Sequence, residues 1–325
     1  MKVVSSDGQL TIDNMDAEPI KIGCGETLEE RIADSKRAIT LASDMSHKYY
    51  DKPLIITYSG GKDSEVILRL AEECLGTDFE VLNSHTTVDA PQTVRHIEKT
   101  FKRLNKKGIK TMYHNRYPVE HTMWELILEK KFPPTRILRY CCKILKETGT
   151  PNRLAVLGVR KAESANRQGR EAFGIRGGQR KLVFFSLDHA EEVHRESQEI
   201  QDPAWDCTLI KTMKEHGDTT LNAIYEWSDR DVWDFIKDRD IEVNPLYAMG
   251  YRRVGCVLCP LAAHSEKLKM CKDFPQYKAN FIAIFDKMIK QEGFKRNDKW
   301  KTGEQCFNWW IENDKDDVKG QMSLF

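Results

Sequence analysis

One short stretch, Ser59-Gly60-Gly61-Lys62-Asp63-Ser64, has the residue types and spacing of a phosphate-binding loop. It follows the apolar run Leu54-Ile-Ile-Thr-Tyr, which is typical of a buried strand, and it leads into a helical pattern. A strand that turns through two glycines into a helix presents backbone N–H groups and the positive end of a helix dipole, which both favour a phosphate. The stretch is not a Walker A loop, because Asp63 stands where that motif has Ser or Thr. The plain alternative is an ordinary strand–turn–helix corner.

Four of the nine cysteines form a second candidate site. Cys141 and Cys142 are adjacent, and such a pair points apart in a strand but can converge at a helix start. Cys256 and Cys259 belong to a Cys-x-x-Cys-Pro turn that points both sulfurs the same way. Four thiolates at one centre bind zinc or an iron–sulfur cluster, although generic zinc sites use two Cys-x-x-Cys knuckles. A redox dithiol and buried unpaired thiols remain alternatives.

The other cysteines read as small apolar side chains in helix faces or strands. They are Cys24, Cys74, Cys207, Cys271 and Cys306.

The elements between these residues predict an α/β fold with a doubly wound, mainly parallel sheet, because apolar strands alternate with helical patterns. The predicted strands begin at Leu54 and cover Phe79–Asn83, Gly108–Tyr113 and Arg153–Arg160. Ligands of such sheets bind beyond the carboxyl ends of the strands. We therefore expect four polar side chains at that edge, namely Ser59, Thr86, Asp89 and Arg160.

Three regions are expected along the chain: an N-terminal arm and helix over residues 1–50, a nucleotide-binding domain over 51–270, and a helical region over 271–325. Two capping boxes start helices, Thr27 with Glu30 and Ser228 with Asp231. The second helix is predicted to bury Val232, Trp233 and Ile236. Residues 168–205 read as a long insertion around one short strand, 182–185, and serve either as a functional lid or as a solvated excursion.

Composition narrows the class of protein only a little. Lys plus Arg number 51 and Asp plus Glu number 50, so the net charge of +1 gives no global argument for nucleic acid or membrane, although a local basic face is compatible with it. There is no long apolar run and no signal-peptide core, so we expect a cytoplasmic protein without membrane contact. In that compartment cysteines are poor evidence for disulfides.

Several stretches together resemble the PAPS reductase family of the pyrophosphate-loop superfamily, over about residues 50–265. The loop matches the Ser-Gly-Gly-x-Asp-Ser pattern of that superfamily. The remaining stretches are Cys141-Cys142, Gly158-Val-Arg160-Lys-Ala-Glu163-Ser164-Ala-Asn-Arg167, and the run from Leu221 through Trp227 and Asn244 to Pro260.

The resemblance implies an adenine nucleotide alpha hydrolase-like, Rossmann-like fold. In cluster-bearing members, such as assimilatory adenylyl-sulfate reductases and DndC-like DNA phosphorothioation proteins, four cysteines hold a [4Fe-4S] cluster. The ligands implied here are Cys141, Cys142, Cys256 and Cys259, with zinc as the other metal that they would accept.

Two departures from the assimilatory reductases shift the implied substrate. Those enzymes carry a C-terminal Glu-Cys-Gly-Leu-His, whereas the last cysteine here, Cys306, lies in Glu-Gln-Cys-Phe-Asn-Trp-Trp and reads as a buried helix face. Their loop also usually departs from Gly-Gly-Lys-Asp-Ser, the form typical of ATP-cleaving members. The resemblance thus favours a protein that cleaves ATP between the α- and β-phosphates with Mg²⁺.

The same resemblance implies roles for the loop. Ser59, Gly60, Gly61 and Ser64 would cradle the pyrophosphate, Lys62 and Arg160 would offset phosphate charge, and Asp63 would bind Mg²⁺. The catalytic candidates are Lys62, Asp63 and Arg160, with Thr86, Asp89 and Arg167 as further nucleotide contacts. Plain alternatives are a solvated Lys62, an Arg160–Glu163 ion pair, a surface pair of Glu163 with Arg167, and an Asp89 that only caps the next helix.

The last five residues, Gln321-Met-Ser-Leu-Phe325, resemble the peptide that binds the bacterial sliding clamp. Such a contact would place the protein at replicating DNA.

Three functions stay open. The first is ATP-dependent sulfur insertion into nucleic acid, with DNA as the expected acceptor and with a sulfur donor such as a cysteine desulfurase. The second is reduction of adenylyl sulfate to sulfite. The third is a non-enzymatic module that keeps the fold and docks to a clamp.

Overall fold

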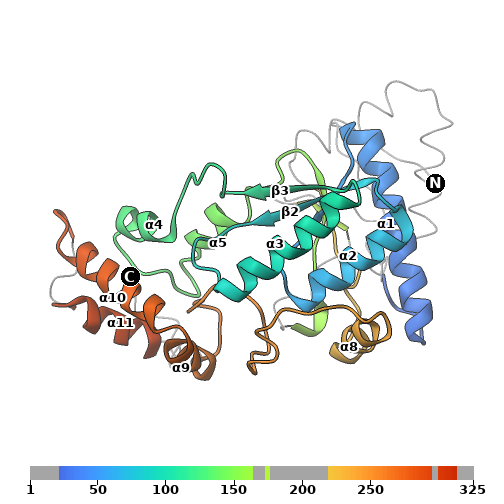
Figure 1. The fold of residues 1–325 in the computed structure, drawn as a ribbon. Coiled ribbons are helices and arrows are strands. Elements are labelled where there is room, and N and C mark those ends of the chain that lie inside the picture. The colour runs from blue at the N-terminus through green and yellow to red at the C-terminus, as the bar shows by residue number, and fades with distance from the viewer. Residues whose placement is uncertain (1–21, 164–172, 176–218, 295–298, 313–325) are drawn as a thin grey trace, which may run out of the picture. The chain divides into compact units, whose positions relative to one another are not determined.

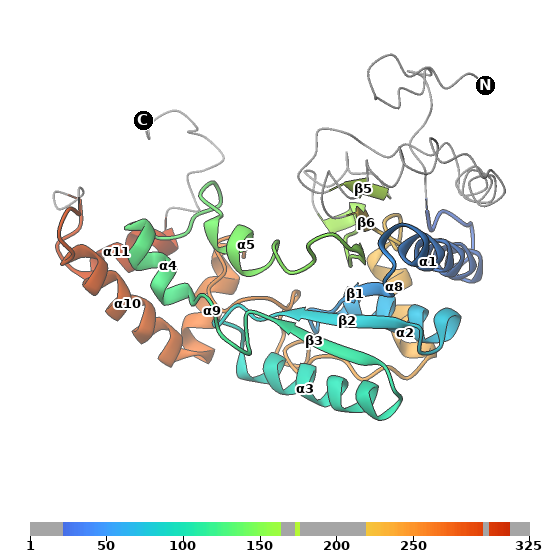
Figure 2. The ribbon, with the colours of Figure 1, turned by 90° about the horizontal axis from the view of Figure 1, so that it is seen from above.

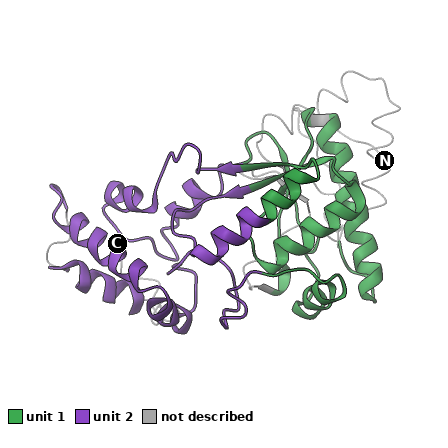
Figure 3. Cartoon of the chain, viewed as in Figure 1, with its two compact units in different colours: residues 1–82, 100–112, 150–243 green, residues 83–99, 113–149, 244–325 purple. Residues whose placement is uncertain are grey.

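The structure is a computed structural model that describes residues 22–163, 173–175, 219–294 and 299–312. Two compact units divide the chain, and each draws on three separate segments (Figure 3). Unit 1 comprises residues 1–82, 100–112 and 150–243, and unit 2 comprises residues 83–99, 113–149 and 244–325.

The described residues form a six-stranded sheet in the order β3-β2-β1-β4-β6-β5. Central β1 pairs in parallel with β2 and β4, β4 pairs in parallel with β6, and β5 is antiparallel at one edge. The mainly parallel α/β sheet predicted from the sequence is therefore confirmed. The strands are β1 (Leu54–Thr57), β2 (Phe79–Ser84), β3 (Lys110–His114), β4 (Leu154–Val156), β5 (Phe173–Ile175) and β6 (Thr219–Leu221).

The central strand is apolar on both faces, as parallel strands covered by helices require. Leu54, Ile55 and Ile56 are all buried. Figures 1 and 2 both show α3 running alongside β2 and β3. The helices are α1 (Leu28–Tyr50), α2 (Lys62–Leu75), α3 (Pro91–Lys106), α4 (Met123–Lys130), α5 (Tyr140–Leu145), α8 (Asp229–Asp238), α9 (His264–Asp273), α10 (Pro275–Ile289) and α11 (Gly303–Glu312), with a 3₁₀ turn at Lys161–Glu163.

Both predicted capping boxes are present. In the first, Thr27 Oγ1 accepts from the Glu30 N–H at 3.2 Å, and Glu30 Oε2 accepts from the Thr27 N–H at 3.1 Å. In the second, Ser228 and Asp231 make the same reciprocal bonds. The buried face of α8 was predicted only in part, because Trp233 is 38% exposed whereas Phe235 is fully buried. Residues 232, 235 and 236 share one helical face, and position 233 lies off it.

One strand prediction differs from the structure, and strand β6 was not predicted. The strand expected over Arg153–Arg160 ends at Val156, and the chain then leaves the sheet after one more bond, from Leu157 N–H to Leu221 O at 2.8 Å. Strand β6 is too short, at three residues, to show a periodicity of its own. The strand expected at 182–185 lies outside the described residues.

The core of unit 2 is aromatic and comes mostly from its helices. Trp310 lies 4.9 Å from Phe281 and 5.4 Å from Phe285, measured between ring centroids. Cys306 is fully buried in this core, as its sequence context predicts. Cys24, in contrast, is exposed, so its assignment as a small apolar side chain is wrong; Cys207 lies outside the described residues. Within the described part of the chain, no helix is long and apolar enough to cross a membrane.

Candidate nucleotide site and cysteine site

The loop after β1 has the backbone of a helix-start phosphate site. The Tyr58 N–H still bonds to Leu82 O at 2.8 Å, and the chain then turns at Gly60, whose φ of 73° favours glycine. Gly61 is the N-cap of α2 and brings no side-chain acceptor to the first turn of the helix. The first N–H groups of any α-helix precede its i→i−4 hydrogen bonds and point out of its end, and this is the arrangement that binds phosphates.

Two serines brace the loop. Ser64 Oγ donates to Gly61 O at 2.8 Å and accepts from the Ser59 N–H at 3.3 Å. The two hydroxyl oxygens lie 3.3 Å apart. Ser64 is buried, so its first role in the structure is to close the loop on itself.

Two cations and two carboxylates meet at the start of α2. Lys62 Nζ lies 3.1 Å from Asp63 Oδ2 and 3.5 Å from Asp229 Oδ1. Arg160 Nε lies 2.5 Å from Asp63 Oδ1, and Arg160 Nη2 lies 2.6 Å from Asp229 Oδ1. The Nη1 group of Arg160 donates to Trp227 O at 3.2 Å. All of these residues belong to unit 1.

The network explains the ionisation of Asp229. Partial burial opposes the charged form, but the hydrogen bond and charge of Arg160 and the charge of Lys62 outweigh it, so the pKa of Asp229 is lowered. Lys62 and Arg160 are only 6% and 1% exposed. The guanidinium of Arg160 thus sits among protein acceptors and fixes Asp63 and Asp229, whereas the Asp229 side chain is 72% exposed. The expected contacts of Arg160 with phosphate and of Asp63 with Mg²⁺ stay predictions.

Asp229 is a residue of the nucleotide site that was not predicted from the sequence. It directly follows the Ser228 cap and is one of two acids in the first turn of α8. Acidic residues are common there because they favour the helix dipole, so the sequence context explains Asp229 without any function. No spacing in the sequence links it to Arg160 or Lys62.

Gly158 packs closely against the backbone of Asp63 and Ser64 in the loop. A Cβ atom built at Gly158 would stand 3.3 Å from Ser64 N and 3.4 Å from the Asp63 carbonyl carbon. A larger residue would therefore press on the first turn of α2.

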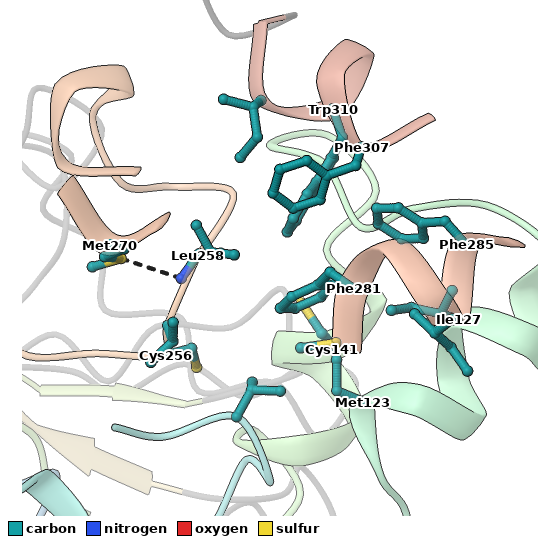
Figure 4. Packing of buried hydrophobic residues seen from close by; sticks show 14 of the residues in the cluster. Met123, Ile127, Cys141, Cys256, Leu258, Met270, Phe281, Phe285, Phe307 and Trp310 are labelled. Carbon is teal, nitrogen blue, oxygen red and sulfur yellow. Dashed lines mark hydrogen bonds between the residues drawn. The ribbon is translucent and has the colours of Figure 1, made fainter. Parts of the chain in front are cut away.

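The four candidate cysteines line one cavity in unit 2. Cys141 and Cys142 lie in the first turn of α5. Cys256 and Cys259 lie in a turn closed by the bond from Cys259 N–H to Cys256 O at 3.2 Å. The cavity has a volume of ≈ 20 Å³, and its walls include Phe281 and Trp310. Figure 4 shows Cys141 and Cys256 in this apolar surrounding, where Leu258 N–H bonds to Met270 Sδ at 3.2 Å.

The thiols have different environments. A hydrogen bond from Cys141, assisted by the charges of Lys146 and Arg139, lowers the pKa of Cys142 to about 5. The same bond, together with burial, raises the pKa of Cys141. Burial raises the pKa of Cys256 to about 11, and its Sγ donates to Thr86 Oγ1 at 3.3 Å. Lys146 and Arg139 are contacts that the sequence analysis did not identify.

The donor set fits a tetrathiolate centre in chemistry, since all four cysteines line one cavity. Among the described residues, however, no three Cys, His, Asp or Glu side chains stand close enough to hold a metal ion. The Sγ of Cys256 points to Thr86, and Cys141 bonds to Cys142, so ligation requires these thiols to rotate. The cavity itself has room for about one water molecule.

Thr86 and Asp89 lie with the cysteines. The Thr86 N–H donates to Asp89 Oδ2 at 2.9 Å, and Asp89 forms an isolated antiparallel bridge with Cys256. Tyr277 Oη donates to Asp89 O at 2.8 Å. Both residues belong to unit 2, whereas the loop at 59–64 and Arg160 belong to unit 1. Arg167 lies outside the described residues.

Comparison with known protein families identifies the family of this chain. The family model for the phosphoadenosine phosphosulfate reductase domain matches residues 53–262, which is more than half of the chain. The chain belongs to this family. The match includes the 59–64 loop, Arg160 and all four candidate cysteines.

Individual relatives of this PAPS reductase family member share only a low sequence identity with it. An uncharacterized protein of Methanocaldococcus jannaschii is 27% identical over 69% of the chain, which corresponds to 40% of that protein. The adenosine 5'-phosphosulfate reductase of Burkholderia cepacia is 32% identical over 32% of the chain and 35% of the enzyme. The PAPS reductase structure from Candida auris aligns with 70% of this chain and 95% of its own at 12% identity, with a TM-score of 0.40. The chain thus spans about half the length, or less, of the first curated relatives that it matches.

Proposed function

We propose that this protein cleaves ATP between the α- and β-phosphates and uses the adenylate to activate an oxygen atom of a nucleic acid for replacement by sulfur. The observation that carries the proposal is the Ser59–Ser64 loop with Asp63 held by Lys62 and Arg160. The same chain gathers four cysteines around one cavity. An ATP site and a thiol site in one PAPS reductase family member favour sulfur transfer coupled to ATP cleavage.

The chain's own residues supply binding and charge at the nucleotide. Backbone N–H groups of the first turn of α2 bind the pyrophosphate part of ATP, and the Lys62 ammonium offsets its charge. Asp63 and Asp229 offer carboxylate oxygens for a hydrated Mg²⁺, which takes few protein ligands. Arg160 fixes the positions of both carboxylates through hydrogen bonds from its guanidinium. Catalysis at this site is positioning and charge stabilisation.

The chemistry balances in two displacements. An oxygen of the acceptor attacks the α-phosphorus, the bond to the β-phosphate oxygen breaks, and pyrophosphate leaves. A sulfur nucleophile at the oxidation level of sulfide then attacks the acceptor atom that bears the adenylated oxygen, and AMP leaves with that oxygen. No electrons are exchanged when the donor is sulfide itself. A persulfide donor, such as the product of a cysteine desulfurase, needs two electrons in addition, which two thiols supply by becoming a disulfide.

Cys141, Cys142, Cys256 and Cys259 are the residues that would hold a [4Fe-4S] cluster, or zinc. When bound there, a cluster would supply thiophilic iron at which sulfur can be held. Thr86 orients Cys256 through its hydroxyl, and Lys146 places a positive charge beside the thiolates.

The experiment is an assay of pyrophosphate and AMP from ATP and Mg²⁺, with anaerobically purified protein, a sulfide source and either duplex DNA or tRNA. We expect AMP and pyrophosphate in equal amounts and a dependence on the nucleic acid. Asp63→Asn should abolish both products. No AMP with any of these acceptors would count against the function.

Reduction of adenylyl sulfate is the second candidate, because curated relatives at 32% identity carry that name. Sulfite formation from adenylyl sulfate with thioredoxin would establish it. The peptide at 321–325 is proposed as a contact for a sliding clamp, and a clamp-binding assay with and without those residues tests that contact separately from the enzyme reaction. If cells that carry Asp63→Asn behaved like wild type and the variant still bound the clamp, the protein would be better described as a non-enzymatic clamp-binding module.

A further inference from the structure

The two segments that carry the cysteines are basic, and the carboxylates nearest to them in the sequence, Glu147, Glu242 and Glu266, lie just beyond their ends. Residues 132–146 include Arg136, Arg139, Lys143 and Lys146, and residues 243–265 include Arg252 and Arg253. Neither segment has an Asp or Glu, although the whole chain carries nearly equal numbers of the two charges. Positive charge is therefore concentrated on the segments that line the cysteine cavity.

The residues just outside the cavity are held in a defined shape. Pro134, which lines the cavity, accepts a bond from Trp310 Nε1 at 2.6 Å. The turn that follows is closed by the bond from Leu138 N–H to Thr135 Oγ1 at 3.0 Å. Arg136 Nη2 donates to Ala262 O at 3.3 Å, which ties this turn to the segment that follows Cys259. The turn is thus preorganised next to both cysteine pairs.

This ordered turn exposes aliphatic side chains. Ile137 is 66% exposed and Leu138 is 50% exposed, and Leu261, two residues after Cys259, is 37% exposed. Arg136 and Arg139 flank the two aliphatic residues and are themselves exposed. We call the six residues Arg136, Ile137, Leu138, Arg139, Lys143 and Leu261 the collar.

The charge pattern favours a polynucleotide. The excess of arginine and lysine over carboxylates on these segments matches a phosphate backbone, and arginine binds phosphate oxygens through two parallel hydrogen bonds. Aliphatic residues between two arginines at the tip of a rigid turn match the wedges that nucleic-acid-binding proteins insert between base steps. An acidic protein would satisfy the charge but would not need an apolar tip flanked on both sides by cations.

We propose that the collar is the surface that receives the nucleic-acid substrate, with Arg136 and Lys143 on backbone phosphates and Ile137 and Leu138 against unstacked bases. This inference rests on the proposed function and gives it a binding surface. It places the sulfur-accepting strand at the mouth of the cysteine cavity.

The test measures binding of labelled duplex DNA, single-stranded DNA and tRNA by fluorescence anisotropy between 50 and 200 mM salt (roughly the range over which phosphate contacts change affinity most visibly). The first variant is Arg136→Gln with Lys143→Gln. The second is Ile137→Ser with Leu138→Ser. The matched control is Lys272→Gln with Lys287→Gln, which removes two exposed cations of unit 2 outside the collar.

We expect the first variant to weaken binding about tenfold or more and to reduce the slope of log K against log salt by about 1.4 to 1.8, as two lost phosphate contacts require. The second variant should weaken binding with the salt slope unchanged. The probe that binds most tightly identifies DNA or RNA as the source of the backbone. Circular dichroism and the metal content of each variant show whether the fold and the cysteine site are intact.

The proposal would be overturned if the collar variants and the control lost equal affinity for nucleic acid, or if the collar variants kept wild-type affinity. The collar would then be assigned to binding of a protein partner. Pyrophosphate release is measured on the same preparations. If wild-type protein releases pyrophosphate while the collar variants bind nucleic acid normally, the collar inference fails and the proposed function stands. If no pyrophosphate is released, the function fails, and the binding series still decides the role of the collar.

Discussion

Arg160 Nε and Asp63 Oδ1 lie 2.5 Å apart, and this contact joins the segment after β4 to the first turn of α2. The two residues are 97 positions apart in the sequence. Arg160 reaches Asp229 and Trp227 O with its other nitrogens, so one buried side chain fixes three groups around the loop. The orientation of the Asp63 carboxylate toward a bound nucleotide therefore depends on Arg160, which is itself buried.

The first prediction concerns Arg160→Lys. Lysine keeps the charge but lacks the planar fork, so at least one of Asp63, Asp229 and Trp227 O loses its partner. We expect the free energy of unfolding to fall by about 1–3 kcal/mol, the cost of an unmade buried hydrogen bond, and pyrophosphate release to fall about 10- to 100-fold. Chemical denaturation and the ATP assay measure the two effects.

Lys161→Gln is the control for this variant, because Lys161 is adjacent but its side chain is 46% exposed and forms a 3.4 Å ion pair with Glu226. Its stability should change by no more than about 0.5 kcal/mol. If Arg160→Lys behaved like Lys161→Gln in both assays, the positioning role of Arg160 would be wrong.

The second prediction concerns the cysteines. Serine at position 141, 142, 256 or 259 should each remove most of the bound metal, because loss of one thiolate opens a four-ligand site. Cys271→Ser is the matched control, since Cys271 is a half-buried cysteine of the same unit that does not line the cavity. Iron, sulfide and zinc are measured after anaerobic purification. Full metal content in all four variants would refute the assignment.

The third prediction is a pH dependence of stability at Glu80. Partial burial opposes its charge, but hydrogen bonds from Lys110 and Arg153 outweigh this and lower its pKa below 4.5. A lowered folded pKa means that the stabilisation is present above the unfolded pKa and is lost as the pH falls through the folded value. Glu80→Gln should therefore be less stable than wild type at pH 7, by about 1–3 kcal/mol, and the difference should shrink as the pH falls below 4.5 and through the lowered folded pKa of Glu80. Urea titrations across that range test it, and a constant difference at all pH values would contradict it.

The fourth prediction concerns Gly158→Ala. The added Cβ would lie 3.3 Å from Ser64 N, so the first turn of α2 must shift by a few tenths of an ångström. We expect weaker ATP binding, by about three- to tenfold, with a small loss of stability. Isothermal titration with a non-hydrolysable ATP analogue measures the affinity. Gly76→Ala, which meets no atom within 4 Å but has a φ of 62°, should lower stability and leave the affinity unchanged.

Much of the fold followed from local signals. The reciprocal bonds of Thr27 with Glu30 need only residues three apart, so the start of α1 was visible in the sequence. The two-glycine turn before α2 was visible for the same reason. Trp233 was assigned to the wrong face, because a large apolar residue beside Val232 looks buried until the partner surface is known.

In the candidate sites, too, some features could be predicted from the sequence and others could not. The four cysteines could be recognised from residue type and spacing, but the contact of Cys256 with Thr86 depends on a chain crossing between positions 170 residues apart. Asp229 could not be linked to Arg160 because that pairing is created only when α8 and the segment after β4 meet. Long-range side-chain partners of this kind leave no periodicity in the sequence.

ATP cleavage and sulfur incorporation can be followed together in one reaction with two labels. Wild-type protein is incubated with α-phosphate-labelled ATP, Mg²⁺, labelled sulfide and the nucleic acid that it binds most tightly, and the products are separated. We expect AMP, no ADP, and one sulfur atom incorporated into the nucleic acid for each AMP formed, with neither product from Asp63→Asn. ADP as the labelled product, or AMP without any sulfur in the nucleic acid under every donor tried, would contradict this expectation.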